Sequence, residues 1–346
     1  MKISKLVLIL SVFTASARAC DLCGCYTPQL ETNPLFGETP EANTMRPWTH
    51  GVYGAVGEQF THFGTTQFNG REVPDPTGQR LESSIIQAVA GYSFDSRFAL
   101  QINVPFIYRS YKRPEGFEIE RGTESGLGDV SLLGKFVLFH VEALREKREL
   151  NAGGKTFVGP GEPDFTASVV LLGGVKSPTG DSSRIKEEFK EIEIDGAPES
   201  GIHGHDLALG TGSWDGIAGA QVSLRYKEAF FQADAQFTLR GESHYSYHFA
   251  NDLSWSGGPG CYLVRRPDAL LGLQCVVSGE NKSTDRFKGR IAEDTGVTSL
   301  YVGPRVLVSL GRFSGEIGAD LPVLMNTTKF QAVPDCRIRA GLAVRF

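Results

Sequence analysis

Residues 229–242 read AFFQADAQFTLRGE, a stretch in which apolar and polar side chains alternate. Every second residue is apolar, namely Phe231, Ala233, Ala235, Phe237 and Leu239. The residues between them are polar, namely Gln232, Asp234, Gln236, Thr238 and Arg240. A period of two is the period of a β-strand, and a tilted strand of about ten residues is long enough to cross a bilayer. This stretch therefore predicts a strand with one apolar face and one polar face.

The same alternation recurs along the chain, for example in RFSGEIGADLPVL (312–324) and CRIRAGLAVRF (336–346). Counting such runs predicts an all-β fold, a transmembrane antiparallel β-barrel of about twelve strands. The predicted strands begin near Thr49, Leu81, Arg97, Leu127, Phe165, Trp214, Ala229, Phe249, Ala269, Val297, Arg312 and Pro334. The competing fold is a soluble β-sandwich, but sandwich strands are usually shorter, about five or six residues.

The connections between the predicted strands alternate in length. Tight turns are expected at residues 95–96, 227–228, 266–268 and 310–312. Longer polar loops are expected at residues 65–80, 113–125, 177–213, 241–248, 279–296 and 326–333. Short turns on one rim and long loops on the other are typical of bacterial outer-membrane barrels. Residues 143–164 are too long for the short-turn rim, so either the strand count is wrong there or the segment is a periplasmic insertion.

The N-terminus indicates export from the cytoplasm. A basic start, an apolar core (residues 6–13) and Ala17-Arg18-Ala19 predict a signal peptide over residues 1–19. Residues 20–46 then form a Cys-rich periplasmic or plug segment, and residues 47–346 form the barrel. Alternating apolar residues that end at Phe346 resemble the C-terminal signal for barrel assembly. We therefore expect the bacterial outer membrane as location, with membrane lipid, lipopolysaccharide and the barrel-assembly machinery as partners.

Residues 20–25 read CDLCGC and place three cysteines close together. Haem attachment is excluded because Gly24, not a histidine, follows Cys23. Cys20, Cys23 and Cys25 could be bridged by disulfides, could hold a metal or exchange electrons with a periplasmic carrier, or Cys20 could carry a lipid. These alternatives stay open at the level of sequence.

Three short motifs occur in a characteristic order. Gly126-Leu127-Gly128-Asp129 opens a strand that contains Lys135, Lys176-Ser177-Pro178-Thr179-Gly180 ends the next one, and Leu209-Gly210-Thr211-Gly212 precedes another. Their order resembles the transporter-like outer-membrane β-barrel family named for the meta-pathway of phenol degradation, over roughly residues 50–346. The resemblance implies a channel for small molecules and brings no catalytic residues.

The polar face of each predicted strand should point into the barrel. The expected lumen-facing residues are Arg109, Asp129, Lys135, Arg225, Asp234, Arg240, Arg305, Glu316, Asp320, Arg337, Arg339 and Arg345. Acidic and basic residues are both present, so we expect weak ion selectivity. If the last two strands form a hairpin, Arg345 should lie near Glu316 and Arg339 near Asp320. About twelve strands also predict a narrow lumen.

These observations predict a passive channel for small solutes, including hydrophobic or aromatic ones, with no cofactor and no enzymatic activity. The net charge of −5 gives no indication of nucleic-acid binding. The alternatives are a metal- or redox-linked outer-membrane component that uses the N-terminal cysteines, and a purely structural barrel.

Two further sets of residues are candidate sites. His203 and His205 lie in the longest predicted outer loop, where imidazoles could bind a transition metal. Cys261 and Cys275 flank a predicted turn almost symmetrically, so a disulfide between them is the second candidate.

Overall fold

The computed structural model describes residues 50–150, 156–189, 194–266 and 268–346, and within them one large sheet forms a closed barrel. The sheet contains 14 strands, and twelve remain in the wall when the side pairings of β2 (Arg71–Glu72) and β5 (Glu118–Leu127) are set aside. The wall strands are β1 (Gly51–Phe68), β3 (Arg80–Ser93), β4 (Phe98–Glu115), β6 (Ser131–Leu150), β7 (Thr156–Lys176), β8 (Asp215–Tyr226), β9 (Ala229–Leu239), β11 (Asp252–Arg265), β12 (Ala269–Lys282), β15 (Val297–Leu310), β16 (Phe313–Thr327) and β17 (Phe330–Arg345).

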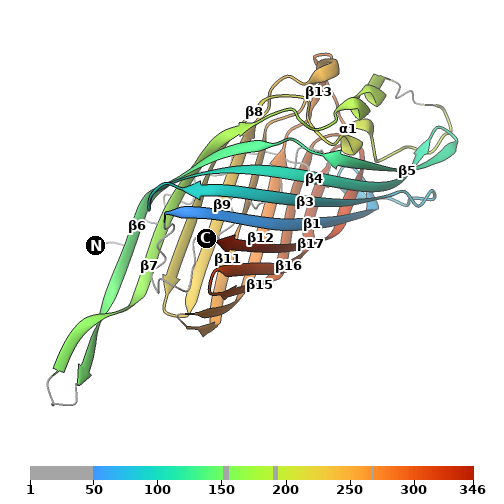
Figure 1. Cartoon of the computed structure of the whole chain (residues 1–346). Coiled ribbons are helices and arrows are strands. Elements are labelled where there is room, and N and C mark those ends of the chain that lie inside the picture. The colour runs from blue at the N-terminus through green and yellow to red at the C-terminus, as the bar shows by residue number, and fades with distance from the viewer. Residues whose placement is uncertain (1–49, 151–155, 190–193, 267) are drawn as a thin grey trace, which may run out of the picture.

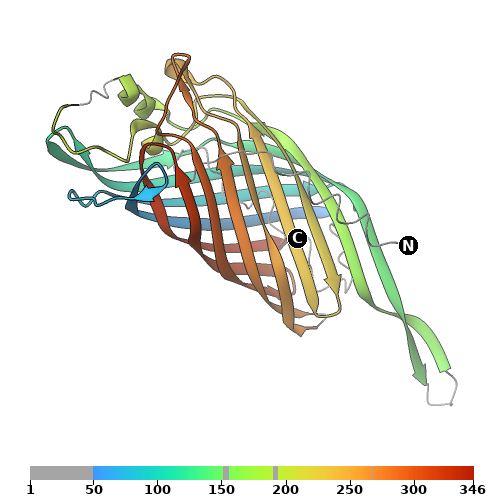
Figure 2. The same ribbon diagram turned by 180° about the vertical axis from the view of Figure 1, so that it is seen from behind.

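Each wall strand pairs antiparallel with its neighbours in the chain, and the last strand returns to the first (Figures 1 and 2). The closing seam joins β17 to β1 from Tyr53 opposite Arg345 to Phe68 opposite Phe330. The Phe346 backbone N–H extends the seam by donating to the Val52 carbonyl, 3.0 Å away. Closure satisfies the backbone groups that an open sheet would leave exposed at its edges.

The burial pattern of the wall is the reverse of that of a soluble protein. In β9, Phe237 and Leu239 are 41% and 57% exposed, whereas Gln232 and Thr238 are each only 4% exposed. Apolar residues outside and polar residues inside are what a barrel in lipid requires. The all-β barrel prediction is confirmed, and the fold is that of a Gram-negative outer-membrane barrel.

In the described part of the chain, no helix is long and apolar enough to cross a membrane.

One rim carries the short connections, which face the periplasm in barrels of this class. The β15–β16 turn consists of two residues, and Gly311 adopts a positive φ of 54° there, which suits a residue without a Cβ. The β6–β7 hairpin lies on the same side and projects far beyond the rim (Figure 1). Residues 143–164 are therefore an insertion, and the strand count is not the error.

Two predicted loops are wrong. Residues 113–125 were expected to be a loop, but β4 and β5 pair there as a hairpin above the wall, from Phe106 opposite Leu127 to Glu115 opposite Glu118. Residues 326–333 were also expected to be a loop, but β16 and β17 approach within two residues of each other in the chain. In both cases strands extend past the membrane, where the apolar alternation that predicts a strand is no longer needed.

Nine of the twelve predicted strand starts lie within three residues of the observed ones, and those at Leu127, Phe165 and Pro334 differ by four, nine and four residues. The run predicted from Leu127 begins at Ser131, because residues 128–130 separate β5 from β6. The strand predicted from Phe165 begins at Thr156, because the projecting hairpin extends β7 beyond the rim. The predicted signal peptide (1–19) and the whole predicted Cys-rich segment (20–46) lie outside the described residues.

A charged residue on the outer face should destabilise the barrel according to its depth. Leu273 faces outward in the interior of β12 and is 45% exposed, and Leu310 faces outward at the periplasmic rim. We expect Leu273→Arg to lower the free energy of unfolding by about 2–4 kcal/mol, and Leu310→Arg by about 0–1 kcal/mol. Denaturant unfolding in lipid vesicles measures both, and equal costs would contradict the assigned membrane position.

Candidate functional site

The long connection between β7 and β8 folds into the extracellular end of the barrel. We call its described residues, 177–189 and 194–213, the inner loop; it contains the 3-10 helix η5 (Ser183–Phe189) and α1 (Gly204–Leu207). Its apolar side chains pack with inward-facing residues of β1, β3, β4, β15 and β17, which belong to one continuous run of neighbouring wall strands. This buried cluster contains Phe63, Leu81, Tyr111, Ile185, Ile202, Leu207, Ala208, Tyr247, Phe249, Val297 and Ala332. The inner loop therefore occupies the lumen at this end.

The three short motifs meet at one point, which we call the Asp129 junction. The Asp129 carboxylate accepts a hydrogen bond from the Gly180 N–H at 3.0 Å on one oxygen. Its other oxygen accepts two bonds from Thr211, one from the backbone N–H and one from the hydroxyl, each at 2.8 Å. One carboxylate thus ties the start of the inner loop to its end. Since Asp129 is only 2% exposed, these bonds are shielded from water.

A second set of contacts closes the Asp129 junction. The Thr179 hydroxyl donates to the Gly128 carbonyl at 2.9 Å and accepts from the Val130 N–H at 2.8 Å, so it bridges the gap between β5 and β6. Gly210 packs against the carboxylate, since a Cβ there would lie 2.5 Å from an Asp129 oxygen. The glycine is required by this close approach. The motifs therefore specify how the inner loop is anchored to the wall.

Buried charges continue from the Asp129 junction into the wall. The Lys176 Nζ lies 3.3 Å from Asp129 Oδ2 and 2.8 Å from Asp215 Oδ2. Arg240 Nη1 approaches Asp215 Oδ2 at 2.9 Å, and its Nε donates to Asp252 Oδ2 at 2.7 Å. Buried ions must be paired to avoid a large desolvation cost, and this alternation of signs provides the pairing.

Arginines on the wall hold the middle of the inner loop. Arg109 is 1% exposed and donates from Nη1 to the carbonyls of Asp206 and Ala208, the second at 2.8 Å. Arg113 pairs with Glu120 at 2.8 Å and with Glu187 of η5 at 2.7 Å. The loop is therefore attached through its backbone and its side chains, in addition to its apolar contacts.

The charged residues expected in the lumen fall into two groups. Nine are buried: Arg109, Asp129, Lys135, Arg225, Arg240, Arg305, Asp320, Arg337 and Arg339. Asp234, Glu316 and Arg345 are partly exposed. Asp129 lies between β5 and β6 rather than on a strand, and Arg225 donates to the Pro163 carbonyl near the periplasmic rim. The other residues lie on wall strands, except Arg240, which directly follows the last residue of β9.

Several of these charges form pairs across neighbouring strands. Arg339 pairs with Asp320, and Arg305 Nη1 lies 3.6 Å from Glu316 Oε2. The expected Arg345–Glu316 proximity is wrong, because the β16–β17 register places Glu316 opposite Gly341. The error arose because the expected hairpin loop of residues 326–333 is a short turn, which changes the register.

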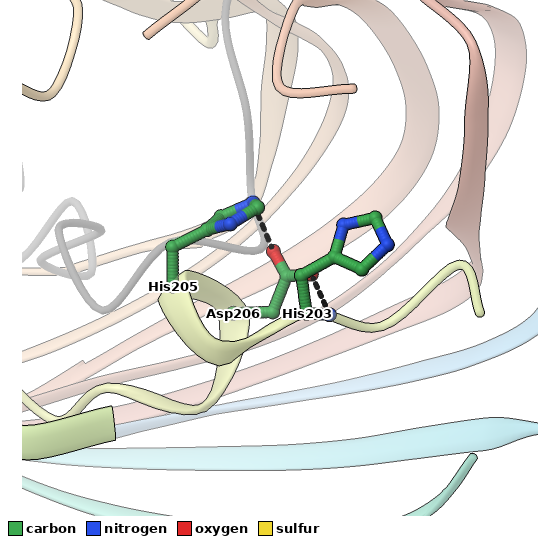
Figure 3. Close-up of side chains that lie close together, drawn as sticks. All are labelled: His203, His205 and Asp206. Carbon is green, nitrogen blue, oxygen red and sulfur yellow. Dashed lines mark hydrogen bonds and ion pairs between the residues drawn. The ribbon is translucent and has the colours of Figure 1, made fainter. Parts of the chain in front are cut away.

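His203, His205 and Asp206 converge at the N-terminal end of α1 (Figure 3). His205 Nδ1 lies 2.8 Å from Glu188 Oε1, and its Nε2 lies 3.2 Å from Asp206 Oδ1. His203 Nδ1 lies 2.7 Å from Asp294 Oδ2. Burial alone would lower the pKa of His205, but Asp206 and Glu188 outweigh it and hold that pKa well above its ordinary value. The structure thus brings both predicted histidines together and adds carboxylates from distant segments.

The predicted disulfide between Cys261 and Cys275 is wrong. Both cysteines are free and exposed. The β11–β12 register places Cys261 opposite Leu273, two residues from Cys275. Such diagonal positions are about 7–8 Å apart, whereas a disulfide usually needs Cα atoms within about 4.4–6.8 Å. The nearly symmetric placement of the two cysteines around the turn predicts a pair only if the register is regular. The β11–β12 pairing instead has a register shift between Tyr262 and Val264.

Cys261 and Cys275 should therefore remain thiols in the folded protein, even after oxidation with copper phenanthroline. Alkylation after denaturation, followed by peptide mass spectrometry, should recover both residues as alkylated cysteine. Recovery of a peptide that joins them would contradict the register. The candidate cysteines Cys20, Cys23 and Cys25 lie outside the described residues.

Sequence reasoning missed several site residues. Lys176 was named only as part of a motif, and Asp215 was not singled out. Lys176 is the last residue of β7 and Asp215 is the first residue of β8, and both lie on the polar face of the wall. Glu280, which lies 3.5 Å from Arg337, could have been found from the alternation of β12. Glu188 lies in the short 3-10 helix η5 and Asp294 in the segment between β14 and β15, and in neither place does a strand periodicity mark a residue as inward-facing.

Comparison with known proteins bears on the fold. No family model matches the chain, and no curated protein matches it. The structure resembles an outer-membrane channel from Pseudomonas putida F1, with 15% identity, a TM-score of 0.52, and coverage of 86% of this chain and 96% of the other. At this identity the likeness shows the fold alone.

Two other solved structures are similar at lower scores. The β-domain of the Bordetella autotransporter BrkA has 12% identity and a TM-score of 0.41, with coverage of 86% of this chain and 100% of the other. The CymD monoaromatic hydrocarbon channel has 8% identity and a TM-score of 0.36, with coverage of 97% of this chain and 98% of the other. These scores are too low to carry an argument about this chain.

Proposed function

We propose that the protein is a passive outer-membrane channel for small solutes, whose extracellular entrance is controlled by the inner loop. The observation that carries the proposal is the Asp129 junction. It anchors both ends of a long loop inside a closed barrel, so that the loop can regulate passage without leaving the wall. The Pseudomonas putida neighbour is described as an outer-membrane channel, which agrees with this role.

Charge pairing in the wall supports low ion selectivity. Arg339 is neutralised by Asp320, Arg305 faces Glu316, and Arg337 lies 3.5 Å from Glu280. A passing ion therefore meets no extended field of one sign. We expect a cation-to-anion permeability ratio close to one, from reversal potentials in a salt gradient.

The composition of the entrance supports small apolar or aromatic solutes as the preferred class. The inner loop contributes Ile185, Ile202 and Leu207 to a buried cluster in which Tyr111, Tyr247 and Phe249 supply aromatic rings. A solute that entered by displacing these contacts would gain most if it could replace them with its own apolar surface. The resemblance of the short motifs to a transporter-like family agrees with this class, and the solute itself stays a prediction.

Planar-bilayer recording of the purified protein tests the proposed function. We expect discrete conductance steps, with a small aromatic solute reducing the current more than a sugar of similar size. A purely structural barrel would give no steps. Absence of steps, both in the wild type and in a variant with a shortened inner loop, would contradict the channel role.

A further inference from the structure

We propose that His203, His205, Asp206 and Asp294 bind one divalent transition-metal cation of the zinc type at the extracellular end of the barrel. The first three residues each offer a ligand atom, and these atoms lie within 4.8 Å of one another. Asp294 contributes from the segment between β14 (Arg290–Ile291) and β15. Two imidazoles and two carboxylates form a ligand set that suits zinc. This site is independent of the proposed channel function.

The hydrogen bonds around each imidazole determine which nitrogen is available. His205 Nδ1 lies 2.8 Å from Glu188 Oε1, so an Nδ1–H donated to this carboxylate leaves the Nε2 lone pair directed toward Asp206. His203 Nε2 lies 2.7 Å from the Ser200 carbonyl, so an Nε2–H donated there leaves Nδ1 directed toward Asp294. Metal-binding histidines have this arrangement, with the second ring nitrogen donating to a carboxylate or a carbonyl.

The ring nitrogens that face the centre of the site each lie beside a carboxylate. His205 Nε2 lies 3.2 Å from Asp206 Oδ1, and His203 Nδ1 lies 2.7 Å from Asp294 Oδ2. A divalent cation at this point would be surrounded by two imidazole nitrogens and two carboxylates, and the two carboxylates would balance its charge.

Burial and spacing favour the cation. The side chains of His205 and Asp206 are 2% and 4% exposed, so water competes weakly for these two ligands, whereas those of His203 and Asp294 are 12% and 26% exposed. Tetrahedral zinc with bonds of about 2.0 Å needs ligand atoms roughly 3.3 Å apart. The ligand atoms of His203, His205 and Asp206 lie within 4.8 Å of one another, and Asp294 Oδ2 lies 2.7 Å from His203 Nδ1, so the side chains would have to close in around a bound ion.

The cation would join two separate segments. His203, His205 and Asp206 belong to the inner loop, whereas Asp294 precedes β15 on another part of the wall. His205 also stacks near Tyr247, with ring centroids 5.9 Å apart, at the edge of the apolar cluster. The bound cation would therefore stabilise the position that the inner loop has in this structure.

Cobalt(II) and zinc titrations of the full chain test this site. We expect one Co²⁺ per chain with the visible absorption of a tetrahedral N/O site, displaced by Zn²⁺. The double variant His203→Gln/His205→Gln should lose this absorption, and Glu188→Gln should weaken binding by about 10–100-fold. A control is His62→Gln. His62 Nδ1 lies 4.0 Å from Glu82 Oε1 and its Nε2 lies 3.7 Å from Asp335 Oδ2, but among the described residues His62 belongs to no group of metal-binding side chains. It should bind as the wild type does.

Two measurements keep the outcome unambiguous. A Cys20→Ser/Cys23→Ser/Cys25→Ser variant should retain the tetrahedral cobalt signal, and heat-modifiable migration on SDS gels should show that each variant is folded. Absence of the signal in the folded wild type would mean a site that holds protons only and would overturn the proposal. Its persistence in the folded double histidine variant, or its loss only with the cysteines, would overturn it as well.

Discussion

Replacing residues 184–207 with a short Gly-Ser linker is expected to raise the single-channel conductance several-fold. This change removes Ile185, Ile202 and Leu207, which fill the extracellular end of the lumen, but keeps the Asp129 junction and the wall. A barrel of about twelve strands has room for a narrow pore once that end is no longer filled. Planar-bilayer recordings measure the effect directly.

The matched control for this truncation is removal of residues 144–162, a segment of similar size at the tip of the β6–β7 hairpin. That hairpin projects from the periplasmic side, away from the inner loop (Figure 2). Its removal should leave the conductance unchanged. Equal conductance of the inner-loop variant and the wild type would show that the loop does not limit passage.

Asp129→Ala should lower the free energy of unfolding by about 3–5 kcal/mol, the cost of removing one partner from a buried ion pair. It leaves the Gly180 N–H and both Thr211 donors without their acceptor, and it takes one of two carboxylates from Lys176. We expect faster hydrogen exchange at residues 209–213, because the base of the inner loop loses its anchor.

The comparison variant is Asp234→Ala, which removes a lumen carboxylate hydrogen-bonded to the Ser256 hydroxyl at 2.6 Å. Because Asp234 is partly exposed, we expect a smaller loss of about 1.5–3 kcal/mol, typical of a hydrogen bond to a charged group. Denaturant unfolding in lipid vesicles compares the two variants. Equal losses would show that the Asp129 junction has no special role in stability.

The membrane-spanning wall could be predicted from sequence because lipid imposes the alternation of apolar and polar residues. In β9, Phe237 and Leu239 face outward and Gln236 and Thr238 face inward, as the period of two indicates. Above the membrane this constraint ends. The polar strand β5, with the sequence EIERGTESGL, was therefore mistaken for a loop.

The site was less predictable, because it depends on how distant segments meet. The motifs around Asp129, Thr179 and Thr211 are visible in the sequence, but nothing local indicates that one carboxylate joins them. The predicted proximity of Arg345 and Glu316 was wrong for a different reason. The sequence does not determine the register of β16 and β17, and the two-residue turn between these strands places Glu316 opposite Gly341. Glu188 in η5 and Asp294 between β14 and β15 lie outside the alternating strands and could be found only from the structure.

The central claim is that solutes pass through the lumen of this barrel, and cysteine accessibility tests it most directly. In a variant with all native cysteines replaced by serine, Ser223→Cys places a thiol on the inner face of β8, between Ser168 and Gln232 on the neighbouring strands. Leu224→Cys places one on the outer face, where Leu224 is 39% exposed. A bulky charged methanethiosulfonate reagent should reduce the single-channel current of Ser223→Cys and leave that of Leu224→Cys unchanged. An unaltered current after confirmed labelling of Ser223→Cys would contradict the lumen as the pathway.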